Sequence, residues 1–305
     1  MSQFRQALEA PLAAIELLHG DWRVQLCAGL GGALTGVWWR GRAVLRDCGR
    51  EALAEHNVRR SACYPLVPYS NRIGYGAFDW EGRQHRLRLN FADEPHAIHG
   101  FGWQRAWRVA LLEAAYAVLV LDHSPDADWP FACSVTQRIA LRDDGLHLEL
   151  TLVNRDSRAA PGGLGWHPYF PLTPQTRLQT GWNAVLVTGD DRLPRTTEPV
   201  PDRWRFDAPR SLENLGVDHC FTGWRGEATI FEADYRLRVM AEGTPAAVLF
   251  RPPGEAFFAL EPVSHSNDAL HFDKPSDTVP MRTLAPGETM TCKLRLEALM
   301  AEHGE

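Results

Sequence analysis

The chain has 305 residues and a formal net charge of −6 at pH 7, which gives no general attraction to nucleic acid or to anionic membranes. Apolar residues make up 45% and charged residues 23%, an ordinary balance for a globular protein. No apolar run approaches the roughly 20 residues that a membrane-spanning helix needs. The six cysteines are scattered without a C-x-x-C pair, which favours reduced thiols and a cytoplasmic location.

Residues 1–18 carry apolar side chains at helical spacing, with an interruption near Pro11. We therefore expect a short amphipathic helix there, and we assign residues 1–20 to an N-terminal helical extension. Residues 21–305 then form a single domain. The glycine-rich stretch 29–32 lacks the third glycine of G-x-G-x-x-G and is not followed by a helix, which argues against a dinucleotide site.

From Asp21 onward the apolar residues alternate with a period of two, which is typical of half-buried strands. The strongest prediction is a hairpin of residues 134–142 and 146–154 around an Asp-Asp-Gly turn. Residues 290–299 predict a long closing strand, whereas the polar, proline-bearing segment 188–217 predicts a connection with little regular structure. Many strands at short spacing indicate an all-β protein with one large antiparallel β-sandwich.

Two polar residues stand in settings that suit proton transfer. His167 lies in Gly-Leu-Gly-Trp-His-Pro-Tyr-Phe-Pro, where glycines and prolines exclude a regular helix and the aromatic rings could line a small-molecule site. Its imidazole titrates near neutrality, although it could also be a buried histidine of an aromatic core. Glu261 ends the apolar run 257–260, where burial would raise its pKa and suit it as a general base.

Three further residues could hold a polar ligand. Arg72, in Ser-Asn-Arg-Ile-Gly, offers a planar fork of donors, and Asp218 is an acid in a mostly apolar stretch. His99 follows His96 at a spacing that could suit a metal, but no further ligands are convincingly spaced, so we expect no metal site. Neither a G-x-S-x-G motif nor a P-loop is present.

Taken together and in order, these motifs resemble the aldose 1-epimerase (galactose mutarotase) family. The resemblance rests on five short segments, namely Asn71-Arg72-Ile73, His99-Gly100, Trp166-His167-Pro168-Tyr169-Phe170, Asp218-His219-Cys220-Phe221 and Leu260-Glu261-Pro262. It spans residues 29–295 and implies a galactose mutarotase-like supersandwich.

The resemblance also implies an isomerase that interconverts the α and β anomers of a free hexose such as galactose or glucose, without a cofactor. Carried over by motif, Glu261 is the general base and His167 the general acid. Arg72, His99 and Asp218 bind and orient the sugar, with His99 close to the ring oxygen. The expected partner is a monosaccharide, and the protein is expected to be a monomer or a homodimer.

Other activities remain open at this stage. A hexose 6-phosphate 1-epimerase of the same family would need a cluster of cationic side chains to bind the phosphate, and Arg72 alone is a weak candidate for that cluster. A non-catalytic carbohydrate-binding protein would not need Glu261 and His167 together. A glycoside hydrolase would use two carboxylates, such as Asp218 and Glu261, and would leave His167 without a role.

Overall fold

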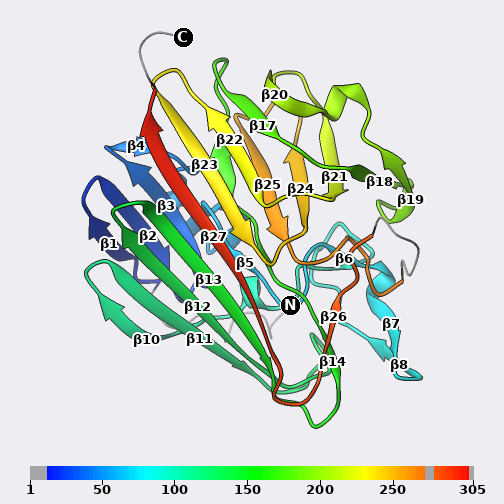
Figure 1. Ribbon diagram of the computed structural model, residues 1–305. Coiled ribbons are helices and arrows are strands. Elements are labelled where there is room, and N and C mark those ends of the chain that lie inside the picture. Colours follow the sequence, from blue (N-terminus) through cyan, green and yellow to red (C-terminus); the bar gives the residue numbers. More distant parts are fainter. Residues whose placement is uncertain (1–11, 272–277, 302–305) are drawn as a thin grey trace.

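The computed structural model describes residues 12–271 and 278–301, and it confirms the predicted all-β sandwich. Its front layer in Figure 1 is a nine-stranded antiparallel sheet in the order β10-β11-β12-β13-β27-β23-β22-β17-β20. These strands are β10 (Arg108–Glu113), β11 (Tyr116–His123), β12 (Cys133–Arg142), β13 (Gly145–Asn154), β17 (Arg177–Thr180), β20 (Phe206–Ser211), β22 (Glu227–Phe231), β23 (Tyr235–Glu242) and β27 (Thr289–Met300).

Behind it lies a sheet whose order is β19-β18-β21-β24-β25-β15-β5, with β16 also paired to β25. Its strands are β5 (Pro65–Leu66), β15 (Gly165–Trp166), β16 (Tyr169–Pro171), β18 (Ala184–Thr188), β19 (Pro194–Pro199), β21 (Val217–Thr222), β24 (Ala246–Arg251) and β25 (Phe257–Val263). We call this eight-stranded sheet the site sheet.

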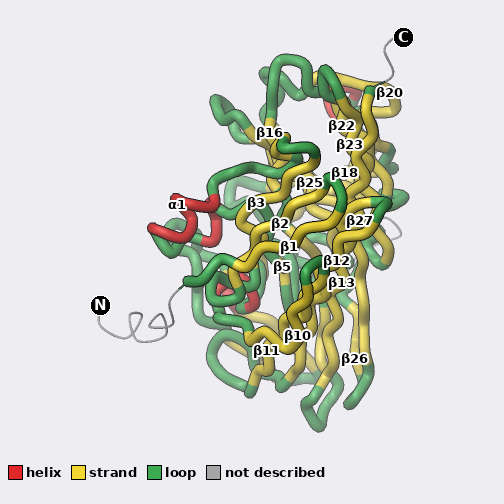
Figure 2. The backbone as a smooth tube through the Cα atoms, turned by 90° about the vertical axis from the view of Figure 1, so that its left-hand side faces the viewer, coloured by secondary structure: helices red, strands yellow, loops and turns green. Residues whose placement is uncertain are grey.

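Smaller elements flank the two large sheets. A four-stranded sheet contains β1 (Ile15–His19), β2 (Trp22–Cys27), β3 (Ala33–Trp39) and β4 (Arg42–Ala43), and strand pairs join β6 (Arg72–Ile73) to β9 (Ala97–Ile98), β7 (Ala77–Trp80) to β8 (Arg83–Arg86) and β14 (Ala160–Gly162) to β26 (Arg282–Leu284). The helical elements of the described chain are α1 (Gly49–Ala54), η1 (Val58–Arg60), η2 (Gly74–Gly76), η3 (Gly102–Gln104) and η4 (Asp202–Trp204). Figure 2 shows α1 on the side away from β27 and β23.

The core lies between the two large sheets because every second side chain of their strands points inward. The predicted hairpin is confirmed as β12 and β13, in which Leu148 pairs with Ile139 and both are buried. From the site sheet, Phe258 and Leu260 enter the same core. Ala259, which lies between these two, and Glu261, which follows them, therefore point to the opposite face.

Two predictions about local structure are wrong. Residues 15–19 of the expected helical extension form strand β1. Pairing with β2 buries Leu17 and gives the backbone N–H and C=O groups of the strand hydrogen-bond partners. The rest of that expected helix falls largely in residues 1–11, which lie outside the described residues. The segment 188–217 contains β19 and β20, each paired to a neighbouring strand in a large sheet.

The predicted free thiols are confirmed: all six cysteines are unpaired, and Cys48 alone among them is not fully buried. No helix in the described part of the chain is both long and apolar enough to cross a membrane.

Candidate active site

Glu261 is placed by the register of the site sheet. It lies on β25 opposite Val248 of β24, and its side chain is on the face that points away from the nine-stranded sheet. Only 2% of the residue is exposed. Its Oε1 lies 3.2 Å from Nε2 of His167, whereas its Oε2 has no hydrogen-bond partner.

His167 occupies the short link between β15 and β16. The preceding Trp166 is buried in the core, where its indole N–H donates to Gln137, so the alternation directs His167 to the other face of the sheet. The backbone N–H of His167 donates to the Tyr64 carbonyl. The rings of Tyr64 and Tyr169 lie 4.8 Å and 4.3 Å from the imidazole, centroid to centroid. His167 is therefore held between two aromatic walls.

His99 approaches the pair from a loop that follows β9. Its backbone has φ of +60°, in the left-handed region that ordinary residues rarely adopt. Two hydrogen bonds to Asn71 hold it there, one from the His99 N–H to the Asn71 carbonyl and one from the Asn71 N–H to His99 Nδ1. Because Nδ1 accepts, the neutral ring carries its proton on Nε2 and can donate from that atom.

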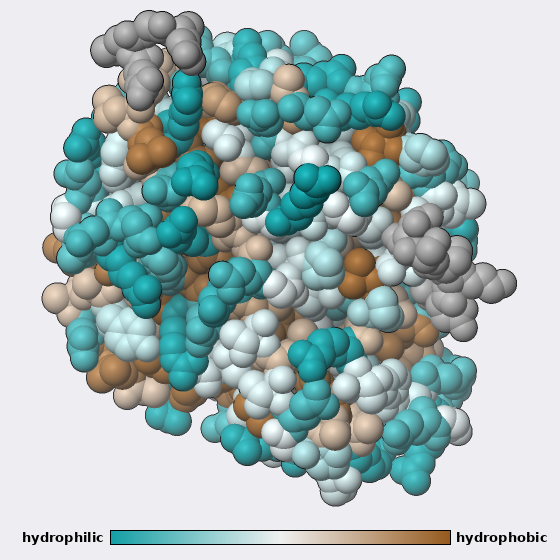
Figure 3. All heavy atoms as spheres, viewed as in Figure 1, coloured by the Kyte–Doolittle hydropathy of each residue, from teal (hydrophilic) through white to brown (hydrophobic). Residues whose placement is uncertain are grey.

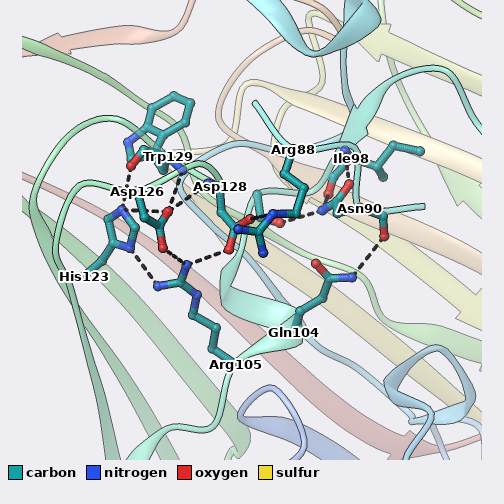
Figure 4. A network of polar contacts seen from close by, with 10 residues as sticks. Arg88, Asn90, Ile98, Gln104, Arg105, His123, Asp126, Asp128 and Trp129 are labelled. Atoms are coloured by element: carbon teal, nitrogen blue, oxygen red, sulfur yellow. Dashed lines mark hydrogen bonds and ion pairs between the residues drawn. The ribbon is translucent and has the colours of Figure 1, made fainter. Parts of the chain in front are cut away.

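Asn90 supports the backbone on both sides of His99. Its amide nitrogen donates to the carbonyls of Ile98 at 2.7 Å and Gly100 at 3.0 Å, and its carbonyl accepts from the Ile98 N–H at 2.8 Å. The neighbouring Gln104 side chain donates to the main-chain carbonyl of Asn90 (Figure 4). The conformation of the His99 loop is thus held by the Asn90 side chain through contacts with the backbone of Ile98 and Gly100.

A second polar cluster anchors the far end of the same segment. The Arg105 guanidinium donates to Asp126 at 2.6 Å, to Asp128 at 2.7 Å and to His123 at 2.8 Å. Figure 4 shows these contacts beside those of Asn90. Together they tie the loop that carries His99 to the turn after β11.

Arg72 lies beside the cluster and is paired to Glu94. Its Nε and Nη2 donate to the two carboxylate oxygens at 3.1 Å and 2.8 Å, a bidentate geometry that few surface pairs achieve. Exposed Arg192 also contacts Glu94, at 2.6 Å. Strand β6 pairs with β9, so Arg72 stands opposite Ile98 and next to the His99 loop.

Asp218 is exposed on β21, although its neighbours in the sequence are mostly apolar. Among the described residues its carboxylate makes no hydrogen bond or ion pair. Its charge nevertheless acts on the site, since it raises the pKa of Glu261 and of Arg72.

Burial decides the protonation of the central pair. Desolvation, aided by Asp218, raises the pKa of Glu261 well above its usual range, although Arg72 acts in the opposite direction. Desolvation, aided by His99 and Arg46, holds the pKa of His167 well below its usual range. The unliganded pair therefore favours a protonated Glu261 beside a neutral His167. In these forms the pair carries no net charge.

His99, His167 and Glu261 each place one ligand-type atom within 4.8 Å of the others, as a divalent metal would require. A histidine that binds through Nε2 must carry its proton on Nδ1, and there it would face the Asn71 N–H donor. Desolvation and the Arg72 charge lower the pKa of His99 to about 3, so the ring is a neutral donor. The trio suits hydrogen bonding better than metal binding.

Four of the five residues singled out from the sequence thus lie close together, three of them buried and His99 half-buried, whereas Asp218 is exposed. Sequence reasoning missed Tyr64, Glu94 and Asn90. Each lies in a loop and acts through contacts with residues distant in the chain. No local pattern could have identified them.

Comparison with known proteins gives the same picture. Residues 14–297 match the aldose 1-epimerase family. The uncharacterised protein YphB of Escherichia coli K12 is 31% identical over 291 residues, covering 92% of this chain and 97% of YphB.

Solved structures share the fold. The crystal structure of a candidate aldose 1-epimerase from Escherichia coli K12 superposes with a TM-score of 0.86 at 29% identity, over 95% of this chain and 99% of that one. A galactose mutarotase-like protein from Clostridium acetobutylicum gives 0.84 at 16% identity, with the same coverage, and shows likeness of fold alone. The chain belongs to the aldose 1-epimerase family.

Proposed function

We propose that this protein is a cofactor-independent aldose 1-epimerase that interconverts the α and β anomers of a free hexose such as glucose or galactose. The observation that carries the proposal is a buried carboxylic acid in contact with a buried imidazole, 3.2 Å apart, with one carboxylate oxygen unpartnered. Buried polar atoms are rarely left without partners, so a polar ligand fits there.

In the proposed reaction one member of the pair removes the proton of the C1 hydroxyl while the other protonates the ring oxygen. The C1–O5 bond breaks and the open-chain aldehyde forms. Rotation about C1–C2 presents the other face of the carbonyl, and closure returns both protons. Glu261 as base with His167 as acid opens the ring, and the two residues exchange these roles when the ring closes. A pair that shares one proton can therefore serve both steps.

The remaining residues would hold the sugar. We assign to His99 a hydrogen bond from Nε2 toward the ring oxygen, and to Asp218 the acceptance of sugar hydroxyl protons. Arg72, already neutralised by Glu94, would donate from the edge of its fork. Tyr64 and Tyr169, whose rings flank the imidazole, would keep His167 in position.

Polarimetry on freshly dissolved α-D-glucose and α-D-galactose tests the proposal. We expect decay of the rotation well above the buffer rate for at least one sugar, and loss of that acceleration in Glu261→Gln and His167→Asn. Sugar binding without any acceleration would favour a carbohydrate-binding protein, and neither binding nor acceleration would point to other aldoses.

A specific observation supports a hexose 6-phosphate as the second candidate substrate. Arg46 and Arg59 are near enough to His167 to lower its pKa, and neither makes an ion pair with a carboxylate among the described residues. The Arg46 guanidinium lies 3.8 Å from the centroid of the Tyr169 ring. Glucose 6-phosphate compared with glucose, in wild type and Arg59→Ala, distinguishes the two: a preference for the phosphate that Arg59→Ala removes would support the second candidate.

A further inference from the structure

Strand β10 (Arg108–Glu113) is the outermost strand of the nine-stranded sheet, and its outer edge has no partner in the described chain. All six of its residues are exposed. Val109, Leu111 and Leu112 are exposed by 37%, 44% and 49%. In Figure 3 hydrophobic atoms show at the lower left, where Figure 1 places β10. We call this strand the β10 edge.

The other edges of the two large sheets are protected by proline, which cannot donate to an added strand. Strand β20, at the opposite end of the same sheet, contains Pro209 between charged residues. In the site sheet, β19 begins and ends with proline and β5 begins with Pro65. The β10 edge has no proline and is apolar in its middle, which is the composition of an edge that pairs.

A β-bulge makes the β10 edge complementary to itself. The register with β11 shifts at Ala110, so Arg108 and Glu113 lie opposite Val120 and Tyr116, on one face of the sheet. Val109 and Leu112 lie opposite Leu119 and Ala117, whose side chains are buried, on the other face.

In an unbulged strand, residues five apart would face opposite sides and could not meet across a two-fold axis perpendicular to the sheet. With the bulge, that axis brings Arg108 of each copy against Glu113 of the other. It also brings Val109 against Leu112. Opposite charges and apolar side chains in directly facing positions stabilise antiparallel pairs.

We infer that two copies of this chain associate through their β10 edges, in antiparallel orientation, to form one continuous sheet across a two-fold axis. The interface is isologous, so the same edge is occupied in both copies. No β10 edge is then left exposed, and the assembly closes as a dimer. Leu18, 54% exposed, extends the apolar contact, since its backbone N–H donates to the carbonyl of Ala114 just beyond β10.

Sedimentation velocity over about a hundredfold range of protein concentration tests this inference, because a short interface dissociates on dilution. We expect wild type to shift from dimer to monomer across the range. Arg108→Glu and Glu113→Arg, made singly, place like charges opposite each other twice per dimer, and each should weaken association about tenfold. The double variant restores opposite charges and should recover the dimer. Arg210→Glu, on the proline-containing β20, is the matched control and should change nothing.

Two results would overturn the inference. Wild type could stay monomeric at every concentration, or the single charge reversals could leave a dimer as strong as wild type. Failure of the double variant to recover what both singles lose would exclude the Arg108–Glu113 pairing. Circular dichroism of each variant separates these outcomes from misfolding. The inference does not depend on the proposed function, because β10 belongs to the nine-stranded sheet and Glu261 to the site sheet.

Discussion

In both large sheets every second side chain lies on the outward face, but the ion pairs there are exposed on the nine-stranded sheet, whereas Glu261 is buried on the site sheet. On the nine-stranded sheet, acids meet bases in water, as in the exposed pairs Arg138–Glu149 at 2.7 Å and Lys293–Glu242 at 3.2 Å. On the site sheet, Glu261 occupies an equivalent outward position but is buried against His167. Exposed pairs contribute little free energy, whereas a buried carboxyl has its pKa displaced.

The difference comes from what covers each face. Figure 3 shows hydrophilic side chains over much of the nine-stranded sheet. The site sheet is instead covered near β25 by the loops that carry His99 and Tyr64, and strand β6 with Arg72 lies beside the His99 loop. A sheet supplies a carboxylate at a fixed place, and loops from elsewhere in the chain turn that place into a buried polar site.

The largest expected effect contrasts the two carboxylates directly. Glu261→Gln should lower kcat by about 10²–10⁴-fold, the usual contribution of a positioned general acid or base, and His167→Asn should do the same. Glu149→Gln, on the solvated sheet, should leave kcat unchanged. Polarimetric rates on the same sugar make the comparison. If both substitutions lowered kcat equally, the buried carboxyl on the site sheet would have no special role in catalysis.

The next effect tests the loops that cover the site. Asn90→Ala removes three hydrogen bonds around His99 and should lower kcat by up to about 10²-fold, because misplacement of about 1 Å has that cost. KM should change less. Gln104→Ala is the matched control, since it removes one contact to Asn90 but none to the backbone beside His99. If both variants kept wild-type kcat, Asn90 would have no positioning role.

A smaller effect is expected at the exposed side of the site. Asp218→Asn removes an acceptor for sugar hydroxyls and should raise KM about tenfold, given the strength of hydrogen bonds to charged groups. It also removes a negative charge that raises the pKa of Glu261, so the pH profile of kcat/KM should move to lower pH. A higher KM with an unmoved profile would show that Asp218 does not act on Glu261.

The smallest effect concerns stability. Below the ordinary pKa of a carboxyl group, Glu261 is protonated whether the chain is folded or unfolded. Above it, the unfolded chain ionises while folded Glu261 stays protonated up to its raised pKa, so stability falls as pH rises through this window. Glu261→Gln should therefore raise the free energy of unfolding at pH 8 by about 0.5–2 kcal/mol, with no gain at pH 4.

Denaturant unfolding at both pH values measures this difference, with Glu149→Gln as the reference. A Glu261→Gln protein that is less stable than wild type at pH 8 would contradict the claim that the raised pKa of Glu261 lowers stability at this pH.

Much of the fold was readable from period-two alternation, as in β12, β13 and β27, where one face packs into the core. Strand β1 was misread because Leu12, Ile15 and Leu18 also fit a helical spacing, and only pairing with β2 decides between the two. Strands β19 and β20 were missed because edge strands rich in proline and charge carry no apolar alternation.

At the site, the candidate proton-transfer residues could be picked out from the sequence because a histidine among aromatics and an acid after an apolar run are unusual in themselves. The residues that hold these side chains in place could not be identified in the same way. Asn90 and Glu94 act through contacts that only the folded chain creates, and nothing beside them in the sequence marks them out. Asp218 lies in a mostly apolar stretch of sequence, yet alternation on β21 turns it toward solvent.

The central claim is that Glu261 and His167 share one proton and exchange it with the sugar. The pH dependence of kcat/KM for the wild-type protein tests it most directly. We predict a bell-shaped profile, because activity is lost when the pair holds two protons and again when it holds none. A flat profile from about pH 5 to 9 would contradict acid–base catalysis by this pair.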